Sequence, residues 1–153
     1  METLRGMIKR HEGWRLKPYL CSKNHMTIGA GHNLDVLSLD PIMTTYLKEH
    51  GTITNEMAEE LLTADIEIAL EGCHRLYHSF DYFTDGRKMA LLDFVFNVGV
   101  GTAKQFYIAN TCINLERWDE AAKEFVQSTW YNQTGKRSRE IVAMILEEKV
   151  EAA

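Results

Sequence analysis

One carboxylate and one cysteine near the N-terminus stand out as groups that could do chemistry. Glu12 lies in the sequence HEGW, and Cys21 and Thr27 lie in YLCSKNHMTIGAGHNL (residues 19–34), which contains no acid. A glutamate between a helix and a hairpin would be partly removed from water, which raises the pKa of a carboxyl and suits a general acid. The Thr27 hydroxyl could hold a water molecule or a substrate oxygen. His32 could titrate or bind a metal, although an ion pair is the commoner role of such a histidine.

The three cysteines, Cys21, Cys73 and Cys112, are widely spaced, so they form neither a CxxC metal site nor a complete set of disulfides. Because their number is odd, at least one thiol is free. Cys73 and Cys112 lie in apolar, helix-like segments, which predicts small buried side chains. Cys21 lies in a polar stretch, where that interpretation is weaker.

The charge distribution is more informative than the net charge of -5, which argues against general nucleic-acid binding. Acids are concentrated in residues 56–71, whereas residues 13–34 and 125–139 contain bases and no acid. If folding brings these two stretches together around Glu12, they form a basic cleft with one carboxylate, suited to an anionic polymer. The alternative is that these charges are simply scattered and solvated.

The elements that must position these groups begin with a helix predicted over residues 2–12, which ends at Gly13. Residues 15–34 contain a turn signal, a short β-like run and glycines, so we expect a twisted hairpin or a three-stranded sheet. The GAG at residues 29–31 is too short and wrongly placed for a dinucleotide-binding loop.

Helices dominate the rest of the predicted structure. A loop around Asp40-Pro41 precedes a long helix over residues 54–72, which Thr54 can cap and which would reach about 27 Å. GRKMALLDFVFNVG is apolar nearly all round and predicts a central buried helix ending at Gly99. Further helices are predicted over residues 102–114, 117–128 and 136–149.

We therefore predict one α+β domain over the 153 residues. Its parts are a small β-containing lobe over residues 13–53, a helical lobe over residues 73–153, the N-terminal helix and the connecting helix 54–72. No apolar run is long enough to cross a bilayer, and the N-terminus lacks the apolar core of a signal peptide. We expect the chain to start out in the cytoplasm and to have no membrane partner.

The order and spacing of several motifs resemble one family throughout most of the chain. These motifs are EGWRLKPYL, MTIGAGHNL, ITNEMAEELLTADIEIAL, FNVGVGTAKQF, RWDEAAKEF and WYNQTGKR. In combination they resemble the lysozymes of T-even bacteriophages, members of glycoside hydrolase family 24. The resemblance implies a lysozyme-like fold and a muramidase that cleaves the β-1,4 bond between N-acetylmuramic acid and N-acetylglucosamine in peptidoglycan.

The same resemblance implies roles for individual residues. Glu12 matches the general acid, Thr27 matches a threonine that helps to hold the attacking water, and Cys21 occupies the position of the family's catalytic aspartate. Arg137 matches an arginine that pairs with the catalytic glutamate, and His32 would pair with Asp65. The matching sugar-contact positions are Asn33, Phe96, Asn97 and Glu124. Plain core packing is the alternative for Phe96, and we expect Trp118 and Trp130 to be core residues rather than sugar platforms.

Cys21 could serve this chemistry only as a thiolate, and an ordinary thiol, with a pKa of about 8.5, is only a few per cent ionised at pH 7. An anionic Glu12 would raise that pKa, whereas Arg15, Lys23 and Arg137 would lower it. Three possibilities follow. In the first, the thiolate attacks the anomeric carbon or stabilises its charge. In the second, the thiol is neutral and the protein is a slow enzyme or only binds peptidoglycan. In the third, Cys21 is oxidised, either to a sulfinic acid that imitates a carboxylate or to a sulfenate that stops activity.

Another enzyme class remains open, because Cys21 with His11, His25 or His32 could form the catalytic pair of a peptidase or amidase acting on the peptide stems of the wall. A purely binding protein is the third class. We expect a monomer that needs no metal or organic cofactor, with peptidoglycan as its partner. The resemblance implies storage in the host cytoplasm and holin-dependent release, but the sequence does not distinguish a free endolysin from a tail-associated enzyme or a bacterial homologue.

Overall fold

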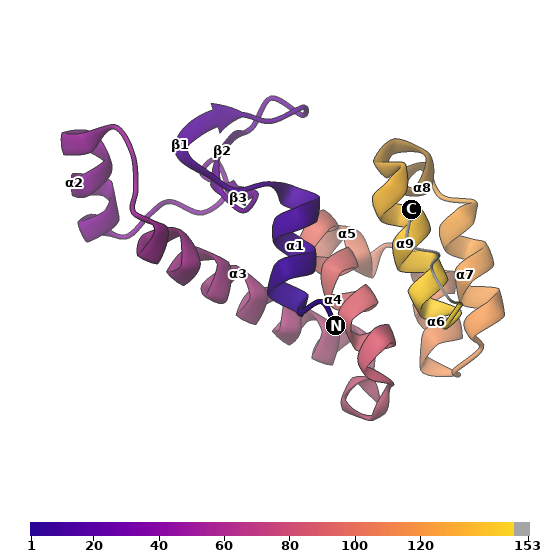
Figure 1. Ribbon diagram of the computed structural model, residues 1–153. Coiled ribbons are helices and arrows are strands. Elements are labelled where there is room, and N and C mark those ends of the chain that lie inside the picture. Colours follow the sequence, from indigo (N-terminus) through magenta and orange to yellow (C-terminus); the bar gives the residue numbers. More distant parts are fainter. Residues whose placement is uncertain (149–153) are drawn as a thin grey trace. The chain divides into compact units, whose positions relative to one another are not determined.

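The computed structural model describes residues 1–148 and divides into two compact units, Met1–Ile66 and a second unit that begins at Glu67. The α-helices and strands of both units are labelled in Figure 1. Helices make up most of the chain, and the strands form one small antiparallel sheet. The predicted α+β class is therefore confirmed. Lys149 of the helix predicted over 136–149 and the remainder of the predicted second lobe up to residue 153 lie outside the described residues.

The first unit begins with helix α1 (Leu4–Glu12), whose N-terminus is capped by the Thr3 hydroxyl. Gly13, with φ 84°, ends the helix and turns the chain into the sheet. Strands β1 (Arg15–Leu20), β2 (Met26–Gly29) and β3 (His32–Asn33) pair antiparallel in that order. Of the two alternatives predicted for residues 15–34, a twisted hairpin or a three-stranded sheet, the structure has the three-stranded sheet.

Helix α2 (Pro41–His50) occupies a region that the sequence interpretation treated as a loop. Its signals are standard: the Asp40 carboxylate caps the Met43 N–H, proline occupies the first turn, and Gly51 ends the helix at φ 70°. Met43 of α2 packs with Ile28 of β2 and Ile53 in the core of this unit. The helix thus closes one side of the hydrophobic cluster that supports the sheet.

Helix α3 (Asn55–Leu76) begins after Thr54, whose hydroxyl accepts a hydrogen bond from the Met57 N–H, as predicted. The helix continues beyond residue 72 and crosses the boundary between the two units. In the first unit, Arg5 and Lys9 of α1 both form ion pairs with Glu59 of α3. These contacts hold α1 against the first half of α3.

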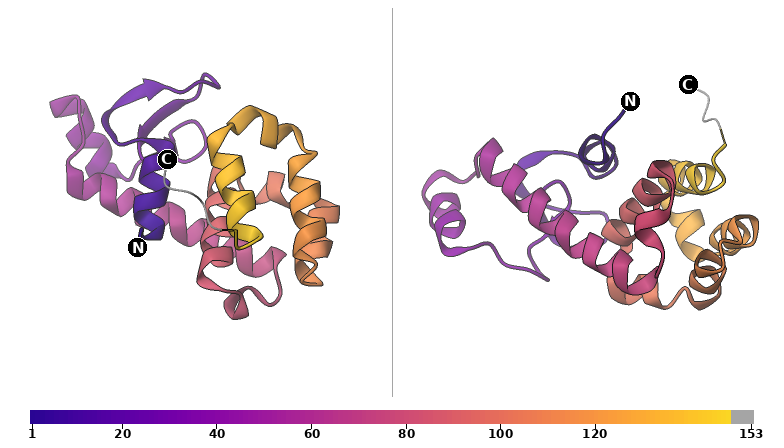
Figure 2. Two further views of the ribbon diagram at one scale, coloured as in Figure 1. Left: turned by 45° about the vertical axis from the view of Figure 1, so that its right-hand side comes forward. Right: turned by 90° about the horizontal axis from the view of Figure 1, so that it is seen from below.

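The second unit is helical throughout the part that the structure describes. A short 3-10 helix η1 (Phe80–Tyr82) precedes α4 (Asp85–Val98), the predicted buried helix, which ends at Gly99. The remaining helices are α5 (Val100–Lys104), α6 (Tyr107–Asn114), α7 (Trp118–Val126), α8 (Thr129–Thr134) and α9 (Lys136–Ile145). Helix α4 lies beside α9, and α6 lies beside α7 (Figure 2).

One predicted helix of the second unit is interrupted and another ends early, and side chains explain both differences. The helix predicted over 102–114 is broken before α6 because Phe106 leaves the helical conformation (ψ 57°) and packs its ring 5.0 Å from that of Phe94. The Asn110 amide bonds the Ala103 carbonyl at 2.9 Å across this break. Ser128 ends the helix predicted over 117–128 by capping a new one, since its hydroxyl accepts from the Tyr131 N–H.

Aromatic side chains form the centre of the second unit. Phe94 makes edge-to-face contacts with Phe106, Phe125 and Trp130, at centroid distances of 4.9–5.0 Å. Cys73 and Cys112 are buried, as predicted. None of the described helices is long and apolar enough to cross a membrane.

Candidate active site

Glu12 is the last residue of α1 and lies against the turn between β2 and β3. Gly31 in that turn has φ 72°, and a Cβ atom there would lie 2.7 Å from the Glu12 Cδ. No side chain larger than hydrogen fits at this position without moving the carboxylate. Gly31 therefore allows the half-buried Glu12 to lie directly on the backbone of the sheet. The sequence interpretation noted the glycines of this stretch but did not connect Gly31 with Glu12.

Cys21 begins a tight turn directly after β1. Its N–H donates to the His25 carbonyl at 2.9 Å, its carbonyl accepts from the Asn24 N–H at 2.9 Å, and Asn24 adopts φ 61°. The turn directs the backbone N–H groups of His25 and Lys23 at the half-buried sulfur, and these hydrogen bonds lower the thiol pKa. The sequence interpretation weighed only the opposing charges of Glu12 and of basic side chains. In the structure, hydrogen bonds to the sulfur account for the lowered pKa.

Thr27 lies on β2, where it is buried and paired across the sheet with Tyr19. Its hydroxyl donates to the His25 carbonyl at 2.9 Å and also forms a hydrogen bond with Cys21 that lowers the Cys21 pKa. A hydroxyl has one proton, so it cannot donate fully to both partners. When the thiol is neutral, Thr27 can accept from the S–H and donate to the carbonyl; when the thiolate forms, its proton turns to the sulfur.

Tyr19 is a member of this group that the sequence interpretation missed. Burial raises the pKa of Tyr19, and the negative charges of Glu12 and Cys21 raise it further, while Arg15 opposes them. The Arg15 guanidinium lies 4.4 Å from the centre of the Tyr19 ring. Tyr19 thus lies within electrostatic reach of both reactive groups. The alternation of side chains in β1 and its pairing with Thr27 are the signals that could have identified it.

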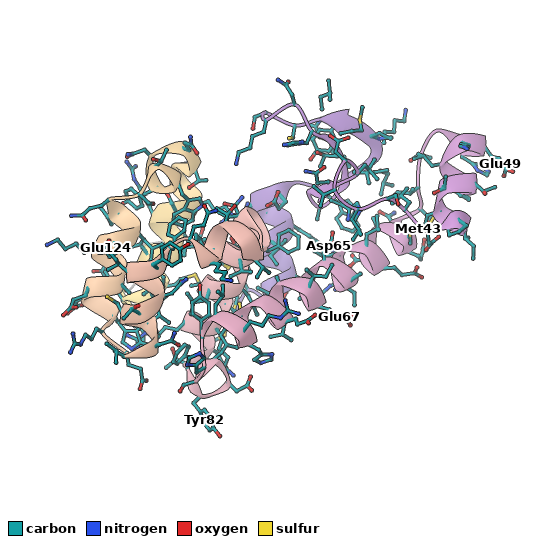
Figure 3. All side chains as sticks on the ribbon, turned by 180° about the vertical axis from the view of Figure 1, so that it is seen from behind. Met43, Glu49, Asp65, Glu67, Tyr82 and Glu124 are labelled. Atoms are coloured by element: carbon teal, nitrogen blue, oxygen red, sulfur yellow. The ribbon has the colours of Figure 1, made fainter. Side chains whose placement is uncertain are left out.

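His32 and Asp65 form the predicted pair and join β3 to α3, where Asp65 is labelled in Figure 3. Nδ1 of His32 lies 2.7 Å from the Asp65 carboxylate, and Nε2 lies 2.8 Å from the Leu37 carbonyl. Burial alone would lower the pKa of His32, but the hydrogen bond and charge of Asp65, with the Leu37 carbonyl, raise it. The Asp65 carboxylate and the Leu37 carbonyl both accept hydrogen bonds, so a ring protonated on both nitrogens can donate to each of them.

In the second unit, the Arg137 Nε donates to the fully buried Asp93 carboxylate at 2.7 Å. Asp93 was not singled out from the sequence, where it is one acid within an apolar helix. The pairing of Arg137 with Glu12 that the resemblance implies stays a prediction.

The predicted sugar-contact residues occupy different elements. Asn33 lies on β3, and its Oδ1 accepts from the Asp35 N–H at 2.9 Å. Phe96 and Asn97 are half-buried near the end of α4, and Asn97 Oδ1 accepts from the Trp130 indole at 2.8 Å. Glu124 lies on α7 (Figure 3), where its charge helps to raise the pKa of Cys112 after burial and Glu120. Trp130 is buried, as expected of a core residue.

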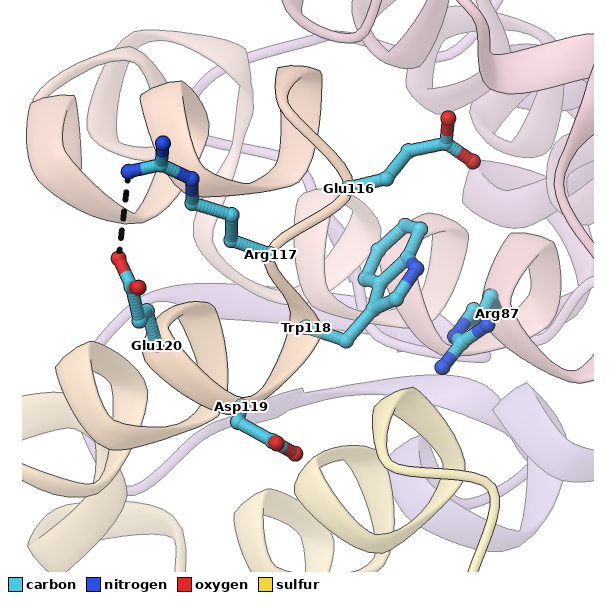
Figure 4. Close-up of a pocket in the computed structure, with 6 residues that line it drawn as sticks. All are labelled: Arg87, Glu116, Arg117, Trp118, Asp119 and Glu120. Atoms are coloured by element: carbon cyan, nitrogen blue, oxygen red, sulfur yellow. Dashed lines mark ion pairs between the residues drawn. The ribbon is translucent and has the colours of Figure 1, made fainter.

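The second unit also contains a pocket of about 390 Å³, drawn in Figure 4. Its charged groups largely engage their neighbours: Arg117 pairs with Glu120 at 3.9 Å, and Arg87 stacks 4.3 Å from the centre of the Trp118 ring. None of the residues predicted for catalysis or sugar contact lines it; its lining residues are Arg87, Glu116, Arg117, Trp118, Asp119 and Glu120. Over residues 1–148, no group of three or more histidine, cysteine or acidic side chains has the arrangement of a metal site.

Comparison with known proteins places these residues in context. The family model described as phage lysozyme matches residues 9–145. The chain is 30% identical to probable T4-type lysozyme 1 of Dictyostelium discoideum, over 95% of this chain and 94% of that protein. It is 28% identical to the pre-baseplate central spike protein Gp5 of Enterobacteria phage T4, over 98% of this chain and 28% of that protein. It is 30% identical to an endolysin of Acyrthosiphon pisum secondary endosymbiont phage 1, over 86% of this chain and 81% of that protein.

Proposed function

Because this chain belongs to the phage lysozyme family, we propose that it is a muramidase that uses Glu12 as its general acid and Cys21 where the family has an aspartate. Its class is that of a lysozyme-type glycoside hydrolase, and its substrate is peptidoglycan. The bond cleaved is the β-1,4 linkage between N-acetylmuramic acid and N-acetylglucosamine. The contact of Glu12 with Gly31 carries the proposal, since it holds a carboxyl beside the sheet whose strand β2 carries Thr27 and whose strand β1 leads into the Cys21 turn.

Cleavage of a glycosidic bond develops positive charge on the anomeric carbon, and two groups usually share the work. Glu12 gives its proton to the leaving oxygen as the bond from that oxygen to the anomeric carbon breaks. The Cys21 thiolate forms a bond to the same carbon. The backbone N–H groups of His25 and Lys23, and then the Thr27 hydroxyl, lower the pKa of this thiol. Water then displaces the sulfur and gives its proton to the Glu12 carboxylate. Two displacements retain the configuration at the anomeric carbon.

The remaining roles in the proposal come from the family resemblance. Asn33, Phe96, Asn97 and Glu124 contact the glycan, Arg137 supports Glu12, and Thr27 also helps to hold the attacking water. The His32–Asp65 pair supports the sheet, which agrees with its position between β3 and α3. We further propose that the protein acts as a monomer and that it is held in the host cytoplasm until a holin releases it to the wall.

The test compares wild type with Cys21→Asp, Cys21→Ser, Cys21→Ala and Glu12→Gln in clearing of wall suspensions, with product analysis. We expect new reducing ends from wild type and Cys21→Asp, and a loss on the order of 10²-fold or more in Glu12→Gln. Retained activity in Glu12→Gln would overturn the assignment of the general acid. Peptide cleavage without new reducing ends would instead identify a cysteine peptidase or amidase.

Three further measurements test the role of Cys21. NMR of fresh product should show the β-anomer first, and initial release of the α-anomer would eliminate the covalent route. Wild-type turnover equal to that of Cys21→Ala, with binding to sacculi intact, would identify a weak enzyme or a binding protein. Mass spectrometry of active protein should show a free thiol at Cys21; a sulfinic acid would favour the oxidised imitation of a carboxylate.

A further inference from the structure

Asp35 is the first acid after Glu12 in the sequence, and its carboxylate faces the turn that joins β1 to β2 (Figure 1). The Asp35 Oδ2 accepts a hydrogen bond from the Met26 N–H at 3.1 Å and lies 3.4 Å from the His25 Nδ1. Met26 is the first residue of β2. Asp35 is therefore tied to the point where the turn that contains Cys21 ends.

The Met26 N–H and the His25 carbonyl belong to one peptide group, which is planar and rigid. The peptide is trans, so these two groups point in opposite directions. The carbonyl accepts from the Cys21 N–H and from the Thr27 hydroxyl, each at 2.9 Å. The N–H at the other end donates to Asp35. Asp35 thus holds the far end of the peptide group on which Cys21 and Thr27 converge.

His25 contacts Cys21 a second time, because its N–H is directed at the sulfur and is the largest cause of the lowered thiol pKa. The turn between them includes Asn24 at φ 61°, a conformation in which asparagine is enriched among non-glycine residues. Residues 22–26 are exposed, so the turn gains little from burial and depends on its hydrogen bonds. A contact from outside the turn, such as that of Asp35, can therefore decide how well the sulfur is served.

The bond from Asp35 to the backbone should matter more than its contact with the His25 ring. The two side chains are 48% and 53% exposed, and an ion pair between exposed groups contributes little because water screens it. The charge of Asp35 would also act in the wrong direction, since a nearby carboxylate raises the pKa of a thiol. Any help that Asp35 gives to the Cys21 thiolate must come from geometry.

We propose that Asp35 is a positioning residue for Cys21: by accepting from the Met26 N–H, it fixes the peptide group that keeps His25 against the sulfur. The inference rests on the proposed function, in which the Cys21 thiolate reacts with the anomeric carbon. Asp35 takes no part in the bond changes. Its carboxylate holds the turn that carries the reacting group and does not replace the aspartate that the family has at position 21.

The variants separate the backbone contact from charge and from the ring. Asp35→Ala removes the acceptor, whereas Asp35→Asn keeps an oxygen for the Met26 N–H and removes the charge. His25→Ala removes the ring and leaves both backbone groups. Asp40→Ala is the matched control, because the Asp40 carboxylate also accepts one backbone N–H in the same unit, that of Met43 at 2.8 Å. Thermal unfolding establishes that each variant is folded.

The first readout is the pH midpoint for alkylation of Cys21 by iodoacetamide, which follows the fraction of thiolate. Asp35→Ala should raise this midpoint by about 0.5 pH unit or more, because the His25 N–H is no longer held at the sulfur. Asp35→Asn should restore most of the wild-type value, and His25→Ala and Asp40→Ala should change it little. A lowered midpoint in Asp35→Ala would show that charge acts directly on the thiolate. That result, an unrestored midpoint in Asp35→Asn, or an equal shift in His25→Ala would overturn the inference.

Amide hydrogen exchange reports the geometry of the turn without depending on thiol chemistry. In Asp35→Ala the Cys21 N–H should exchange about tenfold faster or more, because the carbonyl that accepts its hydrogen bond is no longer anchored. In Asp40→Ala the Cys21 N–H should exchange as in wild type. Equal acceleration in the two variants would show general destabilisation and contradict the positioning role.

Kinetics on wall suspensions connect the turn with the reaction. Asp35→Ala should lower kcat several-fold with KM nearly unchanged, since the variant alters the reacting group rather than the binding of the glycan. A raised KM with unchanged kcat would instead make Asp35 a glycan contact and contradict the inference. Wild type that releases no reducing ends would refute the proposed function, whereas an unchanged Cys21 midpoint in Asp35→Ala would refute this inference alone.

Discussion

Backbone geometry, more than charge, controls the reactivity of Cys21. The turn after β1 supplies the N–H groups of His25 and Lys23 to the sulfur, and Thr27 adds a hydroxyl that can turn toward the thiolate. The other two thiols lie in different surroundings: burial raises the pKa of Cys73 to about 12, and burial with nearby acids raises that of Cys112. A thiolate is the reactive form of a cysteine, so the three side chains should differ in chemistry as well as in position.

Alkylation of the folded protein should therefore occur first at Cys21. We expect iodoacetamide to modify Cys21 with a pH midpoint below that of an ordinary thiol, since its thiolate is stabilised by hydrogen bonds. Thr27→Val removes the hydroxyl and should move the midpoint upward while leaving the backbone donors in place. Peptide mapping by mass spectrometry identifies the modified residue. Faster modification of Cys73 or Cys112 in the folded protein would contradict this account.

Gly31 should be as important to catalysis as the residue it contacts. In Gly31→Ala the new methyl group collides with Glu12, and a displacement of about 1 Å in a reacting group can lower the rate on the order of 10²-fold. Wall-clearing kinetics should show this loss mainly in kcat. Gly51→Ala is the matched control, because Gly51 has nearly the same φ, 70°, but no atom within 4 Å of an added Cβ. If both variants lose activity equally, backbone strain rather than contact with Glu12 is responsible.

Among the helices and strands, the sequence predicted those that are set by signals within a few neighbouring residues. Thr54 before an apolar stripe predicted α3, and the apolar segment ending at Gly99 predicted α4. Helix α2 was missed although Asp40, Pro41 and Gly51 are helix-boundary signals, because Asp-Pro also suits a loop. The break before α6 could not be predicted in this way, since it depends on a contact between Phe106 and Phe94 that exists only in the folded core.

In the candidate site too, contacts between residues close in sequence could be predicted, and contacts that depend on the fold could not. Glu12, Cys21 and Thr27 lie within sixteen residues of each other, so one hairpin prediction was enough to bring them into one region. Gly31 was not linked to Glu12, because that contact depends on the path of the turn between β2 and β3. The hydrogen bond between Asn97 and Trp130 joins residues 33 positions apart, and no local sequence pattern predicts it.

The contact between β3 and α3 should make stability depend on pH through His32. The folded-state pKa of His32 is raised, so the pair with Asp65 stabilises the protein fully below the unfolded pKa of about 6.5, and this contribution is lost as pH rises through the folded pKa. Asp65→Asn should therefore cost most near pH 6, about 3 kcal/mol of unfolding free energy, and progressively less at alkaline pH. Urea unfolding of both proteins across this range measures the difference. A penalty independent of pH would show that the charge of His32 contributes nothing.

For the molecule as a whole, net charge and local charge have opposite signs. The chain carries -5 overall, yet residues 13–34 contain three basic side chains and no acid. Lys23 is exposed in the turn that contains Cys21, and Lys48 is exposed on α2. At low ionic strength, exposed charges act over about 10 Å or more, so those nearest the reacting groups should dominate the approach of an anionic glycan.

Lys23→Glu and Lys48→Glu change the net charge by the same amount and therefore separate the two effects. If the local field governs encounter, Lys23→Glu should lower kcat/KM on soluble wall fragments by about tenfold at low salt, and Lys48→Glu should change it little. The difference should shrink as ionic strength rises, because screening removes interactions between exposed charges first. The alkylation midpoint of Cys21 must be compared in the two variants, since a carboxylate at position 23 could also raise the thiol pKa. Equal losses in both variants, with unchanged midpoints, would mean that total charge rather than the basic hairpin sets the rate of encounter with the wall.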